Sequence, residues 1–556
     1  MSRQHCRRSF HLVQHDVAFD PPGRGHWRRE VAHFPRGQTP LYRAIYAPAS
    51  ADGMRASLAR YGVAGSHLEM AYVNDFSYVR LVPLVETPRA LAARQPPNAA
   101  IWLLTRLVPR FRQRTRAGRV AFEACAWRED GRRWYEEQKP AFEATNLALQ
   151  DEPVDTMSDA DLVDHLRRTF DNLRLGIEVH FDLAIVNLIV IGDFLVAAEA
   201  EGTEPSNALA LLRGSSPASA EVVELLDPVA RAAQAAGAPL NTLDDLRQLG
   251  PQSAAALERY LRHHGHRVVA GYDIDQPTLR EQPQLVVNAV RMLVRRRNAS
   301  SSVQSAKDPD VAGPLAAPLA EARDGYGLRD DNAGPTLQWP AGLARRAVLE
   351  TGARLAGRRC LQKADHAFEL QPNELLAALD GGSLDAAVVA ERAARRQANL
   401  ALDPPPTLGP EEPIPALASA PAPLRRAAAA ILITTPLLDT EPKTDPLTGT
   451  GIGNRIVQGR ARVAADPGEA LELLEPGDVL VVSFTTPAYN AVLPIISGLV
   501  VEEGGALSHA ALVSRELDIP AVIGVAGATS LIPDGAEVVV DPAKGSVRVL
   551  TAAHLR

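Results

Sequence analysis

The chain is poor in cysteine, and the few that it has are far apart. Cys6, Cys125 and Cys360 form no CxxC pair. This spacing gives neither a disulfide framework nor a zinc site, and it fits a reducing compartment. No metal site is therefore expected from the cysteines.

The chain also lacks a targeting segment and a long uninterrupted apolar run. Residues 1–8 are basic, but no apolar stretch follows them, so a signal peptide is not expected. The most apolar run, 183–198, is broken by Asn187 and Asp193 and is too short to span a bilayer. We predict a buried helix there, a cytoplasmic location and no membrane partner.

No excess of positive charge is present either. The 59 Lys and Arg residues are outnumbered by 66 Asp and Glu residues, which gives a net charge of −7. This balance provides no electrostatic reason to expect nucleic acid as a partner. With 556 residues, of which 46% are hydrophobic and 22% charged, the chain is expected to be a globular protein of about three domains.

Composition divides the chain. Stretches rich in Ser, Ala and Pro at 298–318 and 403–423, and a polar stretch at 439–453, are typical of connecting segments. We predict a multidomain protein that is mostly α-helical before the last stretch and mixed β/α after it. The expected boundaries are 1–150 for a helical or mixed region, 151–400 for a helical domain, 401–450 for a Pro-rich linker and 451–556 for a C-terminal domain.

Hydrophobic periodicity supports this division. Apolar residues recur at helical spacing in 159–170, 181–195, 254–261, 283–294, 341–355 and 384–398. Short strand-like runs occupy 460–463, 478–482, 498–501, 521–523, 537–540 and 546–549.

One histidine in the C-terminal region has a suggestive setting. His509 directly follows Ser508, a good N-cap, and comes shortly after Gly504 and Gly505. The free N–H groups at a helix start bind anions, and glycines allow close backbone approach. A neutral imidazole is nucleophilic near pH 7, so this arrangement suits a phosphorylated histidine. From the local pattern alone, a polar residue at a helix start is the favoured interpretation, since histidine is common there and the glycines can serve a turn.

The C-terminal region resembles the swivelling phosphohistidine domain of phosphoenolpyruvate (PEP)-utilising enzymes, a group that includes PEP synthase and rifampin phosphotransferase. The resemblance extends over 453–550 and rests on 457–461, 476–481, 485–487, 498–502, 504–524, 534–535 and 541–547. It implies a β/β/α-type swivelling domain in which His509 accepts a phosphoryl group. Gly504, Gly505, Ser508 and Arg515 are the expected phosphate-binding residues. Leu507 and Thr486 replace a threonine and an aspartate of several family members, which leaves the nucleophile in place.

The central region resembles the helical substrate domain of rifampin phosphotransferase-like proteins. The similarity lies in 263–267, in the acidic and proline-containing run 273–283, and in 326–330 and 365–375. It implies an acceptor site that contains His266, Arg267, Arg329 and Asp330. Arginines bind phosphate through forked donors, and His266 can deprotonate a hydroxyl group. Ala333 stands where the resemblance leads us to look for a lysine.

No glycine-rich phosphate loop followed by lysine occurs, and no ATP-grasp module or PEP-binding barrel is recognised. The sequence therefore predicts a phosphotransferase component whose phosphohistidine passes a group from an ATP- or PEP-derived donor to a small-molecule acceptor. The expected partner is an ATP-grasp subunit or domain in trans, with Mg²⁺ accompanying the nucleotide. The alternative is a catalytically inactive ligand-binding or regulatory homologue that retains the fold.

Overall fold

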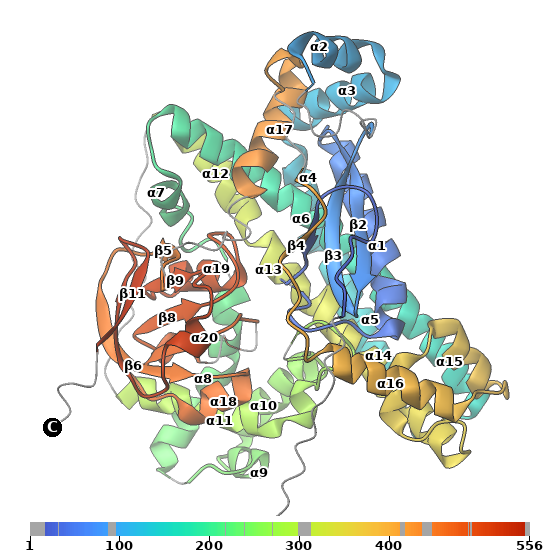
Figure 1. Ribbon diagram of the computed structural model, residues 1–556. Coiled ribbons are helices and arrows are strands. Elements are labelled where there is room, and N and C mark those ends of the chain that lie inside the picture. Colours follow the sequence, from blue (N-terminus) through green and yellow to red (C-terminus); the bar gives the residue numbers. More distant parts are fainter. Residues whose placement is uncertain are drawn as a thin grey trace, which may run out of the picture.

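A computed structural model describes residues 17–31, 33–86, 96–216, 218–237, 239–269, 271–298, 313–411, 417–435, 447–486, 489 and 492–550. They form a mostly helical body (17–435) and a C-terminal domain (447–550) built on a mixed sheet (Figure 1). The predicted fold class, a helical part followed by a β/α domain, is confirmed.

The body is organised around one long helix, α6 (Asp159–Ala200). Ser158 caps it by accepting a hydrogen bond from the Asp161 backbone N–H. The sequence predicted two helices in this region, but they are one 42-residue helix because no proline interrupts them. Among the described residues α6 is the one helix long and apolar enough to cross a membrane, yet 72% of its most apolar window is buried inside the protein. It is the core helix of the body.

The N-terminal region shares this core. Helix α1 (Pro40–Arg60) packs along α6, and a four-stranded sheet lies beside them in the order β2 (Gly65–Val73), β3 (Phe76–Pro83), β1 (Trp27–Arg29) and β4 (Thr407–Leu408). Helices α1 and α6 contribute to the same apolar clusters. The packing therefore does not show the predicted boundary between 1–150 and 151–400.

The prediction of a linker at 401–450 is wrong for the parts of this range that the structure describes. It supplies β4 and a 13-residue helix, α17 (Ala422–Thr434), which packs against α6. Gly192 of α6 permits this contact, since a Cβ at that position would lie 2.1 Å from the carbonyl oxygen of Ala430. Residues 412–416 and 436–446 lie outside the described residues.

The other α-helices and π-helical turns of the body lie between residues 98 and 399. The predicted helices at 254–261, 283–294, 341–355 and 384–398 are confirmed as α10, α11, α14 and α16. Two π-helical turns, η2 and η4, interrupt the helical runs. The elements are α2 (Asn98–Leu107), α3 (Pro109–Glu123), α4 (Ala126–Arg133), η2 (Trp134–Gln138), α5 (Lys139–Asp151), α7 (Pro205–Ala210), α8 (Ala218–Ala236), α9 (Leu243–Arg247), α10 (Pro251–His264), α11 (Pro283–Asn298), α12 (Ala316–Tyr326), α13 (Leu328–Ala333), η4 (Gly334–Gln338), α14 (Trp339–Gly357), α15 (Pro372–Leu379) and α16 (Ala386–Asn399).

The C-terminal domain contains a seven-stranded sheet. Its order is β11 (Ser546–Leu550), β10 (Glu537–Asp541), β6 (Val457–Val463), β7 (Val479–Val482), β8 (Gly498–Val501), β9 (Ala521–Ile523) and β5 (Thr450–Ile452). Strands β6 to β9 are parallel, and β10, β11 and β5 pair antiparallel. Parallel neighbours require crossovers, which contain α18 (Pro467–Leu473) and α19 (His509–Glu516). Helix α20 (Ala528–Leu531) follows β9.

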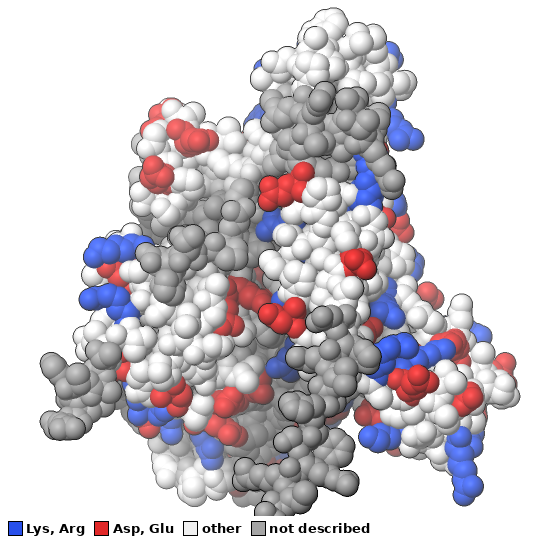
Figure 2. Space-filling view, viewed as in Figure 1, with Lys and Arg blue, Asp and Glu red and all other residues white. Residues whose placement is uncertain are grey.

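The C-terminal domain is seated on the body beside α8, α10 and α11 (Figure 1). Helix α18 contacts α11, and one apolar cluster includes buried side chains of both parts. On the face shown in Figure 2, Lys, Arg, Asp and Glu are interspersed, and no continuous basic surface is seen there. The seating brings the start of α19 against the helical body.

Candidate functional site

His509 is the first residue of α19, and the preceding turn fixes its position. Ser508 accepts a weak hydrogen bond from the Ala511 backbone N–H at 3.4 Å and donates its own N–H to the Gly505 carbonyl at 2.9 Å. Gly504 has a φ of +103°, and a Cβ there would lie 2.9 Å from Ser508 Cβ. The predicted cap and the need for glycine at 504 are therefore visible in the geometry.

A hydroxyl group orients the His509 ring. Thr485 Oγ1 lies 3.0 Å from His509 Nδ1, within hydrogen-bond distance. The contact with the hydroxyl group is thus made by Nδ1 and not by Nε2. The N-terminal end of α19 adds partial positive charge beside the ring, which favours a negatively charged group on it.

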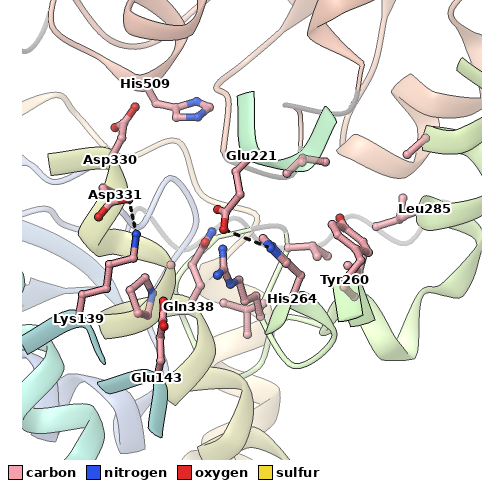
Figure 3. Close-up of a pocket in the computed structure, with 18 of the residues that line it drawn as sticks. Lys139, Glu143, Glu221, Tyr260, His264, Leu285, Asp330, Asp331, Gln338 and His509 are labelled. Carbon is pink, nitrogen blue, oxygen red and sulfur yellow. Dashed lines mark hydrogen bonds and ion pairs between the residues drawn. The ribbon is translucent and has the colours of Figure 1, made fainter. Parts of the chain in front are cut away.

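His509 lines a cavity of about 90 Å³ between the C-terminal domain and the body. Figure 3 shows the ring at one side of this cavity, with Asp330 directed towards it and the remaining labelled side chains rising from the body. The polar and charged lining residues are Lys139, Glu143, Glu221, Tyr260, His264, Arg267, Asp330, Asp331, Gln338 and His509. Of the predicted acceptor residues, the structure thus brings Arg267 and Asp330 to His509.

Arg267 provides a cation on the body side. Its Nε donates to the His263 carbonyl at 3.1 Å, and its guanidinium lies so close to Gly334 that a Cβ there would be 2.7 Å from Nη1. Burial lowers the pKa of Arg267, although an arginine keeps its charge near neutral pH. The fork is therefore a fixed, partly desolvated positive charge.

A second cation reaches the cavity from α5. Lys139 Nζ lies 2.8 Å from Asp331 Oδ1, and Trp134 Nε1 of η2 donates to Asp331 Oδ2 at 2.8 Å. At position 333, where the family resemblance leads us to look for a lysine, the structure has a buried alanine. Lys139, almost 200 positions earlier in the chain, supplies an ammonium group beside the same short helix, α13.

His264 also lines the cavity, although the sequence pointed to His266. The ring of His264 is 4% exposed, stacks on Tyr260 with centroids 4.7 Å apart, and has no hydrogen-bond partner for Nε2 among the described residues. Glu221 Oε1 lies 3.9 Å from this nitrogen. Burial, with the charge of Arg267, lowers the pKa of His264 well below its usual value, so the ring is neutral.

His266 faces a different cavity, of about 510 Å³, on the other side of the same turn. Arg280 and Arg346 line that second cavity with it. Burial, followed by the charges of these two arginines, lowers the pKa of His266 to about 4. The structure therefore does not bring His266 to His509, because neighbouring positions of the turn direct their side chains to opposite sides.

Two other predicted residues have different outcomes. Arg329 belongs to α13, but its side chain lies outside the described part of the chain. Arg515 is buried and lies with Nη1 3.4 Å from the Tyr326 hydroxyl oxygen, at the opposite end of α19 from His509. Its predicted role in phosphate binding has no support from this contact and stays a prediction.

The described side chains do not form a metal site. No group of three or more His, Cys, Asp or Glu residues converges in the described ranges. Near His509, Asp331 is held by Lys139 and Trp134. We derive no step through a metal ion held by the described residues.

Comparisons with known proteins agree with the two regions recognised in the sequence. Residues 474–545 match the mobile domain of PEP-utilising enzymes, and residues 183–328 match the fourth domain of rifampicin phosphotransferase. The C-terminal domain is a PEP-utiliser mobile domain. The first match includes β7, β8 and α19 with His509, and the second includes α8 and α10 with His264 and Arg267.

Relatives share different amounts of the chain. An uncharacterised protein of Mycobacterium tuberculosis is 30% identical over 57% of this chain and 34% of its own length. Rifampicin phosphotransferase of Streptomyces sviceus is 30% identical over 56% of this chain and 36% of its own length. Chondramide synthase of Chondromyces crocatus is 26% identical over 94% of this chain, but over only 14% of its own length. The chain thus spans about a third of the length of the first two proteins.

Proposed function

We propose that the chain is a phosphotransferase in which phosphorylated His509 delivers its phosphoryl group to a hydroxyl group of a small molecule bound by the helical body. The observation that supports this most strongly is the shared cavity. His509 of the mobile domain faces Arg267, Asp330 and Lys139 of the body across about 90 Å³.

The carrier step follows from the ring's hydrogen bond. In the proposed step the ring is the tautomer whose Nδ1–H donates to Thr485 Oγ1, and the lone pair of Nε2 attacks the donor's phosphorus. The bond between that phosphorus and the donor's bridging oxygen breaks, and its electron pair stays on that oxygen of the donor. When the acceptor oxygen forms its bond to phosphorus, the Nε2–P bond breaks and the electron pair returns to Nε2. Because Nδ1 keeps its proton throughout, the leaving group is a neutral imidazole and not an imidazolate.

The body supplies the acceptor side. Arg267 and Lys139 are placed to bind the phosphoryl oxygens, because both present positive charge at the cavity wall. The unpartnered Nε2 of His264 accepts the proton of the attacking hydroxyl group. The charge of the incoming phosphoryl group raises the proton affinity of this ring, which offsets the effect of Arg267.

The size of the cavity restricts how the acceptor enters. A cavity of about 90 Å³ holds the transferred group and the reacting hydroxyl, whereas sites for drug-sized ligands are roughly 300–1,000 Å³. A larger acceptor must therefore bind while the mobile domain is away from the body. This suits a carrier that alternates between loading and delivery.

The donor is proposed to act in trans. ATP with Mg²⁺, bound by a separate ATP-grasp subunit or domain, is favoured over PEP, and the metal accompanies the nucleotide phosphates. The rifampicin phosphotransferase relative suggests a hydroxylated organic compound as acceptor.

A two-step labelling experiment tests the proposal. Wild type and His509→Ala are incubated with radiolabelled ATP, Mg²⁺ and an ATP-grasp protein encoded nearby, or with radiolabelled PEP. The labelled protein is then isolated and mixed with candidate hydroxyl compounds. We expect acid-labile label on wild type alone, followed by its release to one acceptor. Ligand binding that is identical in both proteins, without any label, would favour the inactive binding homologue.

A further inference from the structure

The two ends of α19 have different surroundings. Its N-terminal end presents His509 to the cavity, whereas its C-terminal end contacts the body through Arg515, Glu516 and Asp518. These three side chains and their partners on the body are called here the α19 docking contact.

Three interactions make up the α19 docking contact. Arg515 Nη1 lies 3.4 Å from the Tyr326 hydroxyl oxygen at the end of α12. Glu516 Oε2 accepts the backbone N–H of Gly214 at 2.8 Å. Asp518 Oδ1 pairs with Arg213 Nη1 at 3.1 Å. Because α19 is one short rigid helix, holding its far end also fixes His509 over the cavity.

Glu516 is the buried charge of this contact. The backbone N–H groups of Gly214, Ser215 and Ser216 all act on its carboxylate, an arrangement that favours an anion. However, Glu516 Oε1 and Ser216 Oγ are both buried without a hydrogen-bond partner among the described residues. The carboxylate is therefore only half satisfied when the domain is seated, and burying it carries a desolvation cost.

We infer that the α19 docking contact holds the mobile domain in its delivery position and that ionised Glu516 limits the strength of this docking. An isolated mobile domain regains full hydration of the carboxylate, so leaving the body relieves the cost. The inference rests on the proposed function, because a weak docking contact matters only to a carrier that must leave and be reloaded.

The inference predicts a direction for the effect of pH. Burial raises the pKa of Glu516 to about 7 in the docked protein, against an ordinary value of about 4.5, even though the three N–H groups lower it. The charge of Asp330 adds to the increase. A group whose docked pKa is raised favours docking when it is protonated. Docking is therefore strongest in acid and weakens as pH rises through about 7.

The other charged groups near Glu516 do not reverse this direction. Arg515 is directed to the hydroxyl group of Tyr326. Tyr326 is a buried phenol, and burial raises its pKa. Arg213 is occupied by Asp518, an exposed pair of modest strength.

A distance measurement on the full chain tests the inference. Spin labels are attached at Lys544→Cys on the mobile domain and Asp164→Cys on α6, both of which are exposed. Cys6, Cys125 and Cys360 are replaced by serine. We expect the docking equilibrium constant to fall about tenfold or more from pH 5.5 to pH 8. Glu516→Gln, which removes the charge, is expected to keep the docked distance at both pH values.

Two matched variants sharpen the result. Glu472→Gln removes an exposed carboxylate of the mobile domain and is expected to follow wild type. Asp518→Asn breaks the pair with Arg213 and is expected to weaken docking equally at every pH. A Glu516→Gln protein that follows the wild-type pH dependence, or a wild type whose distances do not respond to pH, would overturn the inference. The measurement needs neither donor nor acceptor, so its failure is distinct from a failure to phosphorylate His509.

Discussion

The two sides of the His509 cavity are built in different ways. The mobile domain contributes a histidine whose cap and glycine turn lie within six consecutive residues, 504–509, and Thr485, which contacts its ring, lies 24 positions earlier. The body contributes Lys139, His264 and Asp331 from three separate helices. The carrier is thus a local motif, whereas the acceptor side is assembled only when the body is folded.

The strongest test of this difference is His264→Gln. We expect discharge of phosphorylated His509 to its acceptor to fall about 100-fold, because the proton acceptor of the hydroxyl group is lost. Loading of His509 by its donor is expected to be unchanged, since His264 belongs to the body. The two rates are measured separately by rapid quench of the radiolabelled protein. An equal loss in both steps would show that the two sides are not independent.

The Lys139–Asp331 pair tests how the body side is held together. Lys139→Met leaves Asp331 without its cation, and we expect about 1–2 kcal/mol less stability in denaturant unfolding, because the lysine is partly solvated. Lys139→Met combined with Asp331→Asn is expected to recover part of that loss. If the double variant loses more unfolding free energy than the two single variants lose together, the pairing is contradicted.

Thr485→Val tests the carrier side, with a smaller expected effect. Loss of the hydrogen bond to Nδ1 frees the ring, and we expect the rate of His509 phosphorylation to fall about tenfold. Thr486→Val is the matched control. Thr486 donates to the Val269 carbonyl of the body at 2.9 Å, so its loss should affect docking and not loading. Similar loading rates in both variants would argue against a role for Thr485.

The sequence predicted the carrier side well and the acceptor side in part. The strands β6 to β11, the cap Ser508 and His509 itself were predicted because each depends on neighbours a few positions away. Arg267 and Asp330 were also predicted, through the family resemblance, and both line the cavity.

The errors have a common physical cause. The sequence indicates His266 and not His264, since spacing alone does not say which side of the turn after α10 each ring faces. Lys139 was missed because its link to Asp331 spans 192 positions. The linker prediction failed at α17, where contact with Gly192 of α6 stabilises a helix in a proline-rich stretch. Each of these features depends on tertiary packing and leaves no short-range pattern.

Among the 14 histidines of the chain, we propose His509 as the phosphoryl carrier. Mapping the acid-labile phosphate by mass spectrometry, after loading by the donor under neutral conditions, tests it most directly. We expect one phosphoryl group per chain, on His509, and none in His509→Gln. A phosphoryl group on His264 or another histidine, with His509 unmodified, would contradict it.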